Sequence, residues 1–296
     1  MPLEGSSMVS LRTKLVSLKE CCTEVAIIAH NEDITLLEST MQKEGFLCKI
    51  FRGGYTAEQM TYASQIRCLI NHAHAWQYLS KSDRPLIIVE ADFVPVTGFG
   101  RLPLPFPLNN SKAQFGWLYS PGSRLYGVNE RHFPHGHGNT TVAYVATPAA
   151  ANFLLAFFDK EMQRPNRGQY TLWDTYIGIF LRWECGIYNY IPHYQYGEHG
   201  GISNPEHASA KIRHWHQADI LWSRLAFMPQ YARDQRLRYR LFRIRGWLRG
   251  VARLVTLRFF DPRDVNEDSS RGRALMCAFS VLRMFKMANL IMLSSV

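Results

Sequence analysis

Two carboxylates stand one residue apart directly after an apolar segment of the chain. Glu90 and Asp92 follow residues 86–89, whose four apolar side chains are typical of a strand buried on both faces. Because side chains alternate along a strand, Glu90 and Asp92 are expected to point the same way, while Ala91 points away. Two acids in this arrangement offer hard oxygen ligands for Mg²⁺ or Mn²⁺, commonly with substrate phosphates completing the shell. A surface turn with two solvated acids is the alternative that the spacing leaves open.

The segment upstream of the acids carries further residues of a known pattern. Residues 63–77 read Ala-Ser-Gln-Ile-Arg-Cys-Leu-Ile-Asn-His-Ala-His-Ala-Trp-Gln, and a short polar spacer separates them from the strand. These segments resemble the signature of the family 25 glycosyltransferases, roughly Gly-Glu-Ile-Gly-Cys-x-Leu-Ser-His, a helix, and Leu-Ile-x-Glu-Asp-Asp-Val. The positions that keep this register are Ile66, Cys68, Ile70, His72, Trp76, Glu90 and Asp92. The positions that depart from it are Gln65, Arg67, Asn71 and Ala91.

Two later segments match the same family in the same order. Residues 143–148 read Ala-Tyr-Val-Ala-Thr-Pro, as in the family's next strand and helix start, and Asp174 takes the place of an isolated aspartate. The resemblance covers about residues 24–205 and implies a GT-A fold, an α/β fold with one Rossmann-like, mostly parallel sheet. It further implies an inverting, metal-dependent glycosyltransferase. Such an enzyme moves sugar from a nucleotide diphosphate sugar, commonly a UDP-sugar, to a glycan or lipid-linked acceptor in lipopolysaccharide or surface polysaccharide assembly.

The resemblance also implies roles for the three acids. Glu90 and Asp92 are expected to hold a divalent cation, Mn²⁺ or Mg²⁺, which bridges the two phosphates of the donor and acts as a Lewis acid. Asp174 is the candidate base that removes the proton of the attacking acceptor hydroxyl. The alternative for Asp174 is an acid in the first turn of a helix, stabilised by the helix dipole alone.

Three further residues are candidates for contact with the donor or the metal. His199 lies in the glycine-rich segment Tyr-Gly-Glu-His-Gly-Gly, where GT-A transferases commonly complete the metal shell. Ser203 is a candidate phosphate contact just after it. His72 matches the family histidine, which implies a structural role or a contact with the donor. A loop histidine without such a role remains the alternative for His199, and a packed core residue remains the alternative for His72.

Alternating strands and helices must position these residues. We expect strands at residues 24–30, 46–51, 86–92, 115–119, 141–147 and 186–191, and helices at 34–44, 56–80, 148–160 and 170–181. This alternation argues for an α/β fold, a mostly parallel sheet with helices on both faces. Long loops are expected at residues 94–113, 122–139 and 193–207, and such loops are usually functional or mobile.

Positive charge gathers in one part of the chain. The net charge of +10 comes mainly from residues 231–260, which hold nine arginines and one acid. Residues 233–258 interleave these arginines with apolar and aromatic side chains, as in helices that lie on an anionic membrane surface. A solvated basic face is the alternative, and nucleic-acid binding is not expected because no recognition module is present. We therefore expect a lead-in at 1–23, a GT-A-like domain at 24–230 and a tail of basic amphipathic helices at 231–296.

Cysteine spacing and hydropathy predict the cellular setting. The six cysteines form neither a Cys-x-x-Cys pair nor a disulfide framework, no signal peptide is recognisable, and no apolar run approaches about 18 residues. We expect a cytoplasmic protein, peripheral to the inner membrane face. Two other functions stay open: a metal-dependent hydrolase that combines the acids with His135 and His137, and a basic adaptor with a degenerate GT-A domain, which Ala91 and Gln65 favour.

Overall fold

The computed structural model describes residues 16–109, 111–129, 133–201, 217–233 and 235–260. Within these residues an eight-stranded sheet runs in the order β2-β1-β3-β8-β5-β9-β7-β6, and a separate ribbon pairs β4 with β10. The strands are β1 (Glu24–Ala29), β2 (Leu47–Arg52), β3 (Leu86–Glu90), β4 (Phe93–Pro95), β5 (Phe115–Tyr119), β6 (Arg124–Val128), β7 (Pro134–His137), β8 (Ala143–Ala146), β9 (Asn189–Tyr190) and β10 (Gly197–His199). The helices are α1 (Leu18–Cys21), α2 (Thr35–Lys43), α3 (Ser64–Leu79), α4 (Pro148–Met162), α5 (Trp173–Ile179) and α7 (Arg236–Val255).

The chain reverses its direction across the sheet between β1 and β3. β1 pairs in parallel with β2 on one side and with β3 on the other. The connection through α2 leads from β1 to β2, and the connection through α3 then crosses back over β1 to reach β3. In open α/β sheets, ligands bind outside the carboxyl ends of the strands at such a switch point. Glu90 lies there, opposite Ile28 in the register of β1 and β3.

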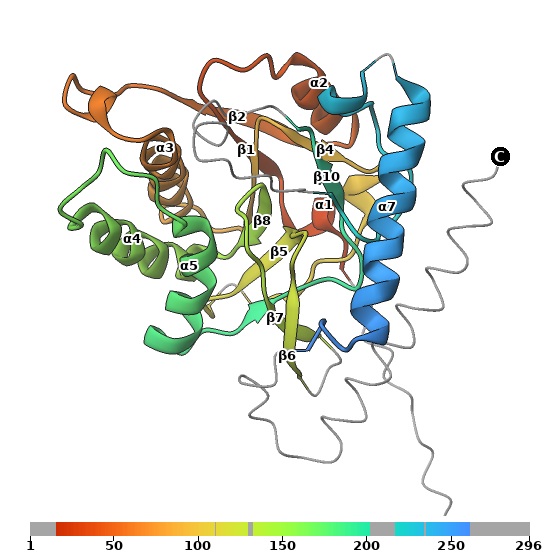
Figure 1. Ribbon diagram of the computed structural model, residues 1–296. Coiled ribbons are helices and arrows are strands. Elements are labelled where there is room, and N and C mark those ends of the chain that lie inside the picture. The colour runs from red at the N-terminus through yellow and green to blue at the C-terminus, as the bar shows by residue number, and fades with distance from the viewer. Residues whose placement is uncertain (1–15, 110, 130–132, 202–216, 234, 261–296) are drawn as a thin grey trace, which may run out of the picture.

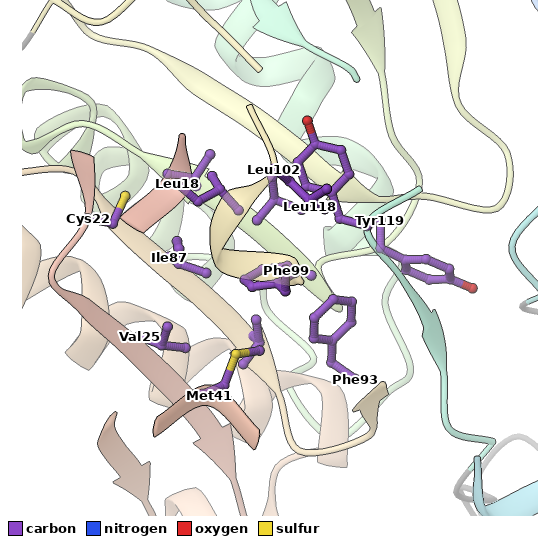
Figure 2. Close-up of a cluster of buried hydrophobic side chains, with 14 of the residues drawn as sticks. Leu18, Cys22, Val25, Met41, Ile87, Phe93, Phe99, Leu102, Leu118 and Tyr119 are labelled. Atoms are coloured by element: carbon purple, nitrogen blue, oxygen red, sulfur yellow. The ribbon is translucent and has the colours of Figure 1, made fainter. Parts of the chain in front are cut away.

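Helices cover both faces of the sheet, as expected. α1 and α2 pack against one face, where Leu18, Met41 and Ile87 belong to the buried cluster drawn in Figure 2. α3, α4 and α5 lie together on the other face (Figure 1), where Trp76 and Leu154 are buried. Alternate residues of β3 serve the two cores, because side chains of a strand point to opposite faces in turn. The α/β class with one large sheet and flanking helices is confirmed.

The half of the sheet beyond β3 combines parallel and antiparallel strand pairs. β8 is antiparallel to both β3 and β5, β5 and β9 are parallel, and β7 is antiparallel to β9 and β6. The expected loop at residues 122–139 is wrong in part, because it contains the hairpin β6–β7. Strand β7 was not expected because glycine is unusual inside strands. The fold requires glycine here, since a Cβ on Gly136 would lie 2.5 Å from the Arg124 carbonyl oxygen.

Helix α7 packs along one side of the molecule beside the β4–β10 ribbon (Figure 1). Its inward face carries Gly246, Gly250 and Leu254, which are buried, and its outward face carries exposed apolar residues. No described helix is both long and apolar enough to cross a bilayer. The second amphipathic helix expected after residue 260 lies outside the described residues, and the division of the chain into three parts stays a prediction.

Candidate active site

Glu90 is held at the end of β3 from several sides. Its backbone N–H donates to the Val142 carbonyl, and the next N–H, of Ala91, donates to the Ile28 carbonyl at 2.8 Å. Its side chain points to the α3 face, where Oε1 accepts a hydrogen bond from Thr141 Oγ1 at 2.7 Å and lies 3.3 Å from His72 Nε2. The strand was expected to reach Asp92 but ends at Glu90. Ala91 packs against the opposite core, which leaves no direct place at the site for the missing middle acid.

His72 belongs to a buried chain of hydrogen bonds that ends at Glu90. Its ring is fully buried on α3, and Nδ1 lies 2.8 Å from the Tyr144 hydroxyl, which also accepts a hydrogen bond from Trp76 Nε1 at 2.8 Å. The simplest assignment lets the Tyr144 hydroxyl donate to Nδ1, so that Nε2–H donates to Glu90. His72 therefore orients the carboxylate rather than facing a ligand.

Asn71, which replaces the family serine, fixes α3 against the end of β1. Its side-chain amide donates to the Ala29 carbonyl at 3.0 Å and to the Tyr55 hydroxyl at 2.8 Å. The residue is almost completely buried, so these two bonds satisfy both amide protons inside the protein. The helix that carries His72 is thereby tied to the strand beside Glu90.

Cys68 completes a second possible ligand group with His72 and Glu90. The three ligand atoms lie within 4.8 Å of one another, and within the described residues this is the one His/Cys/Asp/Glu trio so arranged. Burial raises the pKa of the thiol well above its ordinary value, and the negative charges of Glu90, Asp92 and Asp174 raise it further. The thiol thus stays protonated at neutral pH, and metals bind the thiolate. This environment therefore favours a hard cation bound by the carboxylates over a metal bound by the Cys68 thiolate.

His199 reaches Asp92 through the ribbon of β4 and β10. The two strands are antiparallel with His199 opposite Phe93, the residue that follows Asp92. His199 Nε2 and Asp92 Oδ2 consequently lie 3.0 Å apart. A Cβ on Gly200 would lie 2.7 Å from the Asp92 carbonyl oxygen, so the glycine is needed for the ribbon to close.

The pair of Asp92 and His199 has the spacing of two neighbouring metal ligands. Two atoms that are each about 2.1 Å from a cation, at right angles to each other, lie about 3.0 Å apart. Carboxylate oxygen and imidazole nitrogen together suit Mn²⁺ and related divalent ions. Gly201 N–H donates to His199 Nδ1 at 2.9 Å, which places the ring proton on Nε2, toward Asp92. Binding of a cation at Nε2 therefore requires this proton to move to Nδ1, which would end the hydrogen bond from Gly201 N–H.

The electrostatics of His199 reflect the acids around it. Burial alone lowers the pKa of the ring, but Asp92, Glu90 and Glu198 outweigh burial, so the pKa lies above its ordinary value. A cation that replaces the Nε2 proton would be stabilised by the same negative charges.

Asp174 lies close enough to Glu90 for their charges to interact. Trp173 docks α5 on α3, because its Nε1–H donates to the Gln65 carbonyl at 2.9 Å and its ring meets His72 edge-on. Burial and then the negative charge of Glu90 raise the pKa of Asp174 to about 7. A carboxyl with such a pKa is well matched to general-base catalysis near neutral pH.

The structure thus gathers Glu90, Asp92, Asp174 and His199 around one edge of the sheet. Each carboxylate acts on a common neighbour: Glu90, Asp92 and Asp174 all raise the pKa of the Cys68 thiol. Ser203, the expected phosphate contact, lies outside the described residues.

The histidines of the hydrolase hypothesis lie elsewhere. His135 and His137 are on β7, packed against Tyr126. Burial lowers the pKa of His135 to about 4, with the nearby Arg182 adding to the shift. Neither histidine belongs to a three-ligand group with an acid among the described residues. The geometry gives the hydrolase hypothesis no support.

Comparisons with known proteins add little. No protein-family model matches the chain, and no curated protein matches it significantly. One similar solved structure is a glycosyltransferase involved in the glycosylation of the major capsid of PBCV-1, with 8% identity and a TM-score of 0.41 over 63% of this chain and 98% of that chain. Another, described as a glucose-1-phosphate thymidylyltransferase from Bacillus anthracis in complex with a sucrose, has 14% identity and a TM-score of 0.33 over 67% and 80%. Similarity at this level shows neither a family nor a function for this chain.

Proposed function

We propose that this protein is a metal-dependent glycosyltransferase that uses a nucleotide diphosphate sugar. The observation that carries the proposal is the place of Glu90 at the switch point between β1 and β3, with Asp92, His199 and Asp174 brought to it from other segments. Crevices at such switch points bind nucleotides in many α/β proteins. The motif resemblance to family 25 supports the finer assignment, with a UDP-sugar as donor and a glycan or lipid-linked acceptor of the surface polysaccharide type.

Each residue has a role in the proposed reaction. Mn²⁺ or Mg²⁺ held by Glu90, Asp92 and His199 would neutralise the charge that develops on the departing diphosphate. Asp174 accepts the proton of the acceptor hydroxyl as that oxygen attacks the anomeric carbon, which inverts the configuration. General-base help of this kind adds about two to four powers of ten in rate. His72 and Thr141 hold the Glu90 carboxylate in place.

The outward face of α7 suits an anionic bilayer, which would bring the enzyme to a lipid-linked acceptor. Leu237, Leu241, Ile244 and Leu248 form an exposed stripe along the helix. Exposed arginines flank this stripe, and they are Arg236, Arg238, Arg240 and Arg245. Apolar side chains among basic ones are the pattern of helices that lie in the interface of anionic membranes. This face therefore supports a peripheral attachment of the enzyme to the membrane.

The test measures UDP release from UDP-glucose and UDP-galactose with Mn²⁺, in wild type and in Asp92→Asn. The substitution removes one carboxylate charge from the cation, so turnover should fall about a thousandfold, the equivalent of several kcal/mol. Asp159→Asn, an exposed acid on α4, is the matched control and should keep wild-type turnover. Unchanged turnover in Asp92→Asn, or no effect of either sugar nucleotide on the melting temperature of the wild type, would contradict the proposal.

A further inference from the structure

We propose that Glu198 and Arg243 are positioning residues for His199, so that α7 forms part of the support of the active site. The cation-binding role of His199 rests on the proposed function, whereas the positioning itself concerns the ring in the metal-free protein. Neither residue was predicted from the sequence, because an acid within β10 and an arginine 45 positions later show no common pattern.

Glu198 accepts hydrogen bonds from the backbone of His199 and from the side chain of Arg243 on α7. Its side chain has 0% exposure. One oxygen, Oε1, accepts hydrogen bonds from the N–H of His199 at 3.1 Å and of Ala218 at 2.7 Å. The other oxygen, Oε2, accepts a hydrogen bond from Arg243 Nη1 at 2.7 Å. One buried carboxylate therefore joins strand β10, which carries His199, to the segment at residue 218 and to helix α7.

Helix α7 has little freedom to shift relative to this carboxylate. Arg243 Nη1 also donates to the Ala218 carbonyl at 3.2 Å. A Cβ on Gly246 would lie 2.6 Å from the same carbonyl oxygen, so the helix backbone sits directly against Ala218. Arg243 and Gly246 are one helical turn apart and lie on the same face of α7. The helix thus fixes Arg243 where Glu198 can meet it.

The ribbon that carries His199 needs such support. In the described residues β10 is three residues long and pairs with β4 alone, so it has fewer ladder hydrogen bonds than a strand inside the main sheet. A buried carboxylate without its cationic partner is strongly unfavourable, so loss of Arg243 should displace Glu198 toward water. Displacement of Glu198 would carry the adjacent His199 with it. Misplacement of a catalytic group by about 1 Å can cost about a hundredfold in rate.

The chain offers a matched control on the same helix. Arg253 Nη1 donates to Asp219 Oδ2 at 2.9 Å, and this carboxylate also has 0% exposure. The pair has the same chemistry and a similar depth, but Arg253 also donates to the Ser123 carbonyl, whereas Arg243 also donates to the Ala218 carbonyl beside Glu198. Arg253→Gln should thus reproduce the loss of a buried ion pair without the effect on His199.

The experiment compares Arg243→Gln, Arg253→Gln and Arg243→Lys with wild type by two measurements. Mn²⁺ alone is titrated and the free ion is followed by electron paramagnetic resonance. In the metal-free protein, histidine-selective ¹⁵N labelling gives the ring signals of His199, assigned with His199→Asn. We expect Arg243→Gln to weaken Mn²⁺ binding about tenfold or more, as loss of outer-shell partners typically does, and to shift or broaden the His199 signals. Arg253→Gln should change neither, and Arg243→Lys should recover part of both.

The two readouts separate the inference from the proposed function. If wild type binds no Mn²⁺ but the His199 signals respond to Arg243→Gln alone, the positioning stands and the cation role fails. If Arg243→Gln and Arg253→Gln leave the His199 signals as in wild type, the positioning role is overturned, whatever the metal does. Equal changes in both variants would also overturn it, because they would indicate a general loosening of α7.

Discussion

The two halves of the candidate site are built in different ways. Glu90 ends a strand that is hydrogen-bonded on both sides within the main sheet, and its side chain is oriented by buried Thr141 and His72. Asp92 and His199 instead lie at the β4–β10 ribbon, outside that sheet. The ribbon is supported by the close approach of Gly200 and by the ion pair of Glu198 with α7.

Because of this difference, substitutions in the two halves are expected to have different effects. The β3 half is fixed by the core of the fold, so its geometry changes only when the core does. The ribbon half is supported in part by a helix whose outer surface faces away from the body, so its geometry can respond to what that helix contacts. Changes to the first half should therefore act on chemistry and stability, and changes to the second on the affinity for the cation.

The largest effect is expected from Asp174, which lies beside the fixed half. Asp174→Asn removes the base, so turnover should fall by about two to four powers of ten. Burial and Glu90 raise the pKa of Asp174 to about 7 in the metal-free protein, and a cation bound at Glu90 should lower it, so wild-type turnover should climb as pH rises toward 7. The remaining turnover of the variant should lack that rise. A pH–rate series with saturating UDP-galactose and Mn²⁺ measures both.

The same substitution should stabilise the metal-free protein. The folded state keeps a proton on Asp174 that the unfolded chain releases near its ordinary pKa of 3.8, so this carboxyl makes stability fall as pH rises from 3.8 to about 7. Asp174→Asn removes that penalty, by about 1–2 kcal/mol at pH of about 8 and by almost nothing at pH of about 4. Urea unfolding with EDTA at the two pH values tests this, and a variant less stable at both would refute the buried, proton-binding state.

A middle-sized effect is expected from Tyr144, which orients His72. Tyr144→Phe leaves the buried Trp76 and His72 nitrogens without the hydroxyl, so the free energy of unfolding should drop by about 1–3 kcal/mol. Turnover should fall about tenfold as Glu90 loses its fixed orientation, while Mn²⁺ affinity changes less than in Arg243→Gln. Tyr126→Phe, which loses a buried hydroxyl bonded to Asn189 at 3.0 Å, controls for stability. Equal turnover in the two variants would show that the hydrogen bonds from Tyr144 through His72 to Glu90 have no special role in orienting the carboxylate.

The contrast between the halves also explains what the sequence could predict. Strand β3 follows from a local apolar pattern, and the bounds of β1, β5 and α4 agree with the expected segments to within about two residues. Helix α3 was expected from residue 56 but begins at Ser64, after a separate short 3-10 turn at Gln59–Thr61. Local patterns also located Glu90 and its motif. They did not show Thr141 or Tyr144 as its partners, because β8 reaches β3 through an antiparallel pairing that depends on the whole sheet.

The ribbon half was less accessible from the sequence. The resemblance singled out His199, but its approach to Asp92 comes from a strand of three residues within an expected loop. Glycine lowers strand propensity, and here it is required by close backbone contacts that only the folded chain shows. Local patterns did not single out Glu198, because burial of a charge becomes favourable only with its distant partner Arg243 in place.

The smallest effect concerns the outer face of α7. It tests whether the ribbon half responds to what this helix contacts. Vesicles of phosphatidylcholine with phosphatidylglycerol should bind the protein, and binding should raise turnover severalfold because α7 supports His199 through Arg243. Arg240→Gln removes one exposed arginine from this face and should weaken vesicle binding about fivefold, about 1 kcal/mol. Arg164→Gln, a partly exposed arginine on the far side of the sheet core, should bind as wild type does. Vesicles that bind yet leave the turnover of wild type unchanged would show that the ribbon half is as fixed as the strand half.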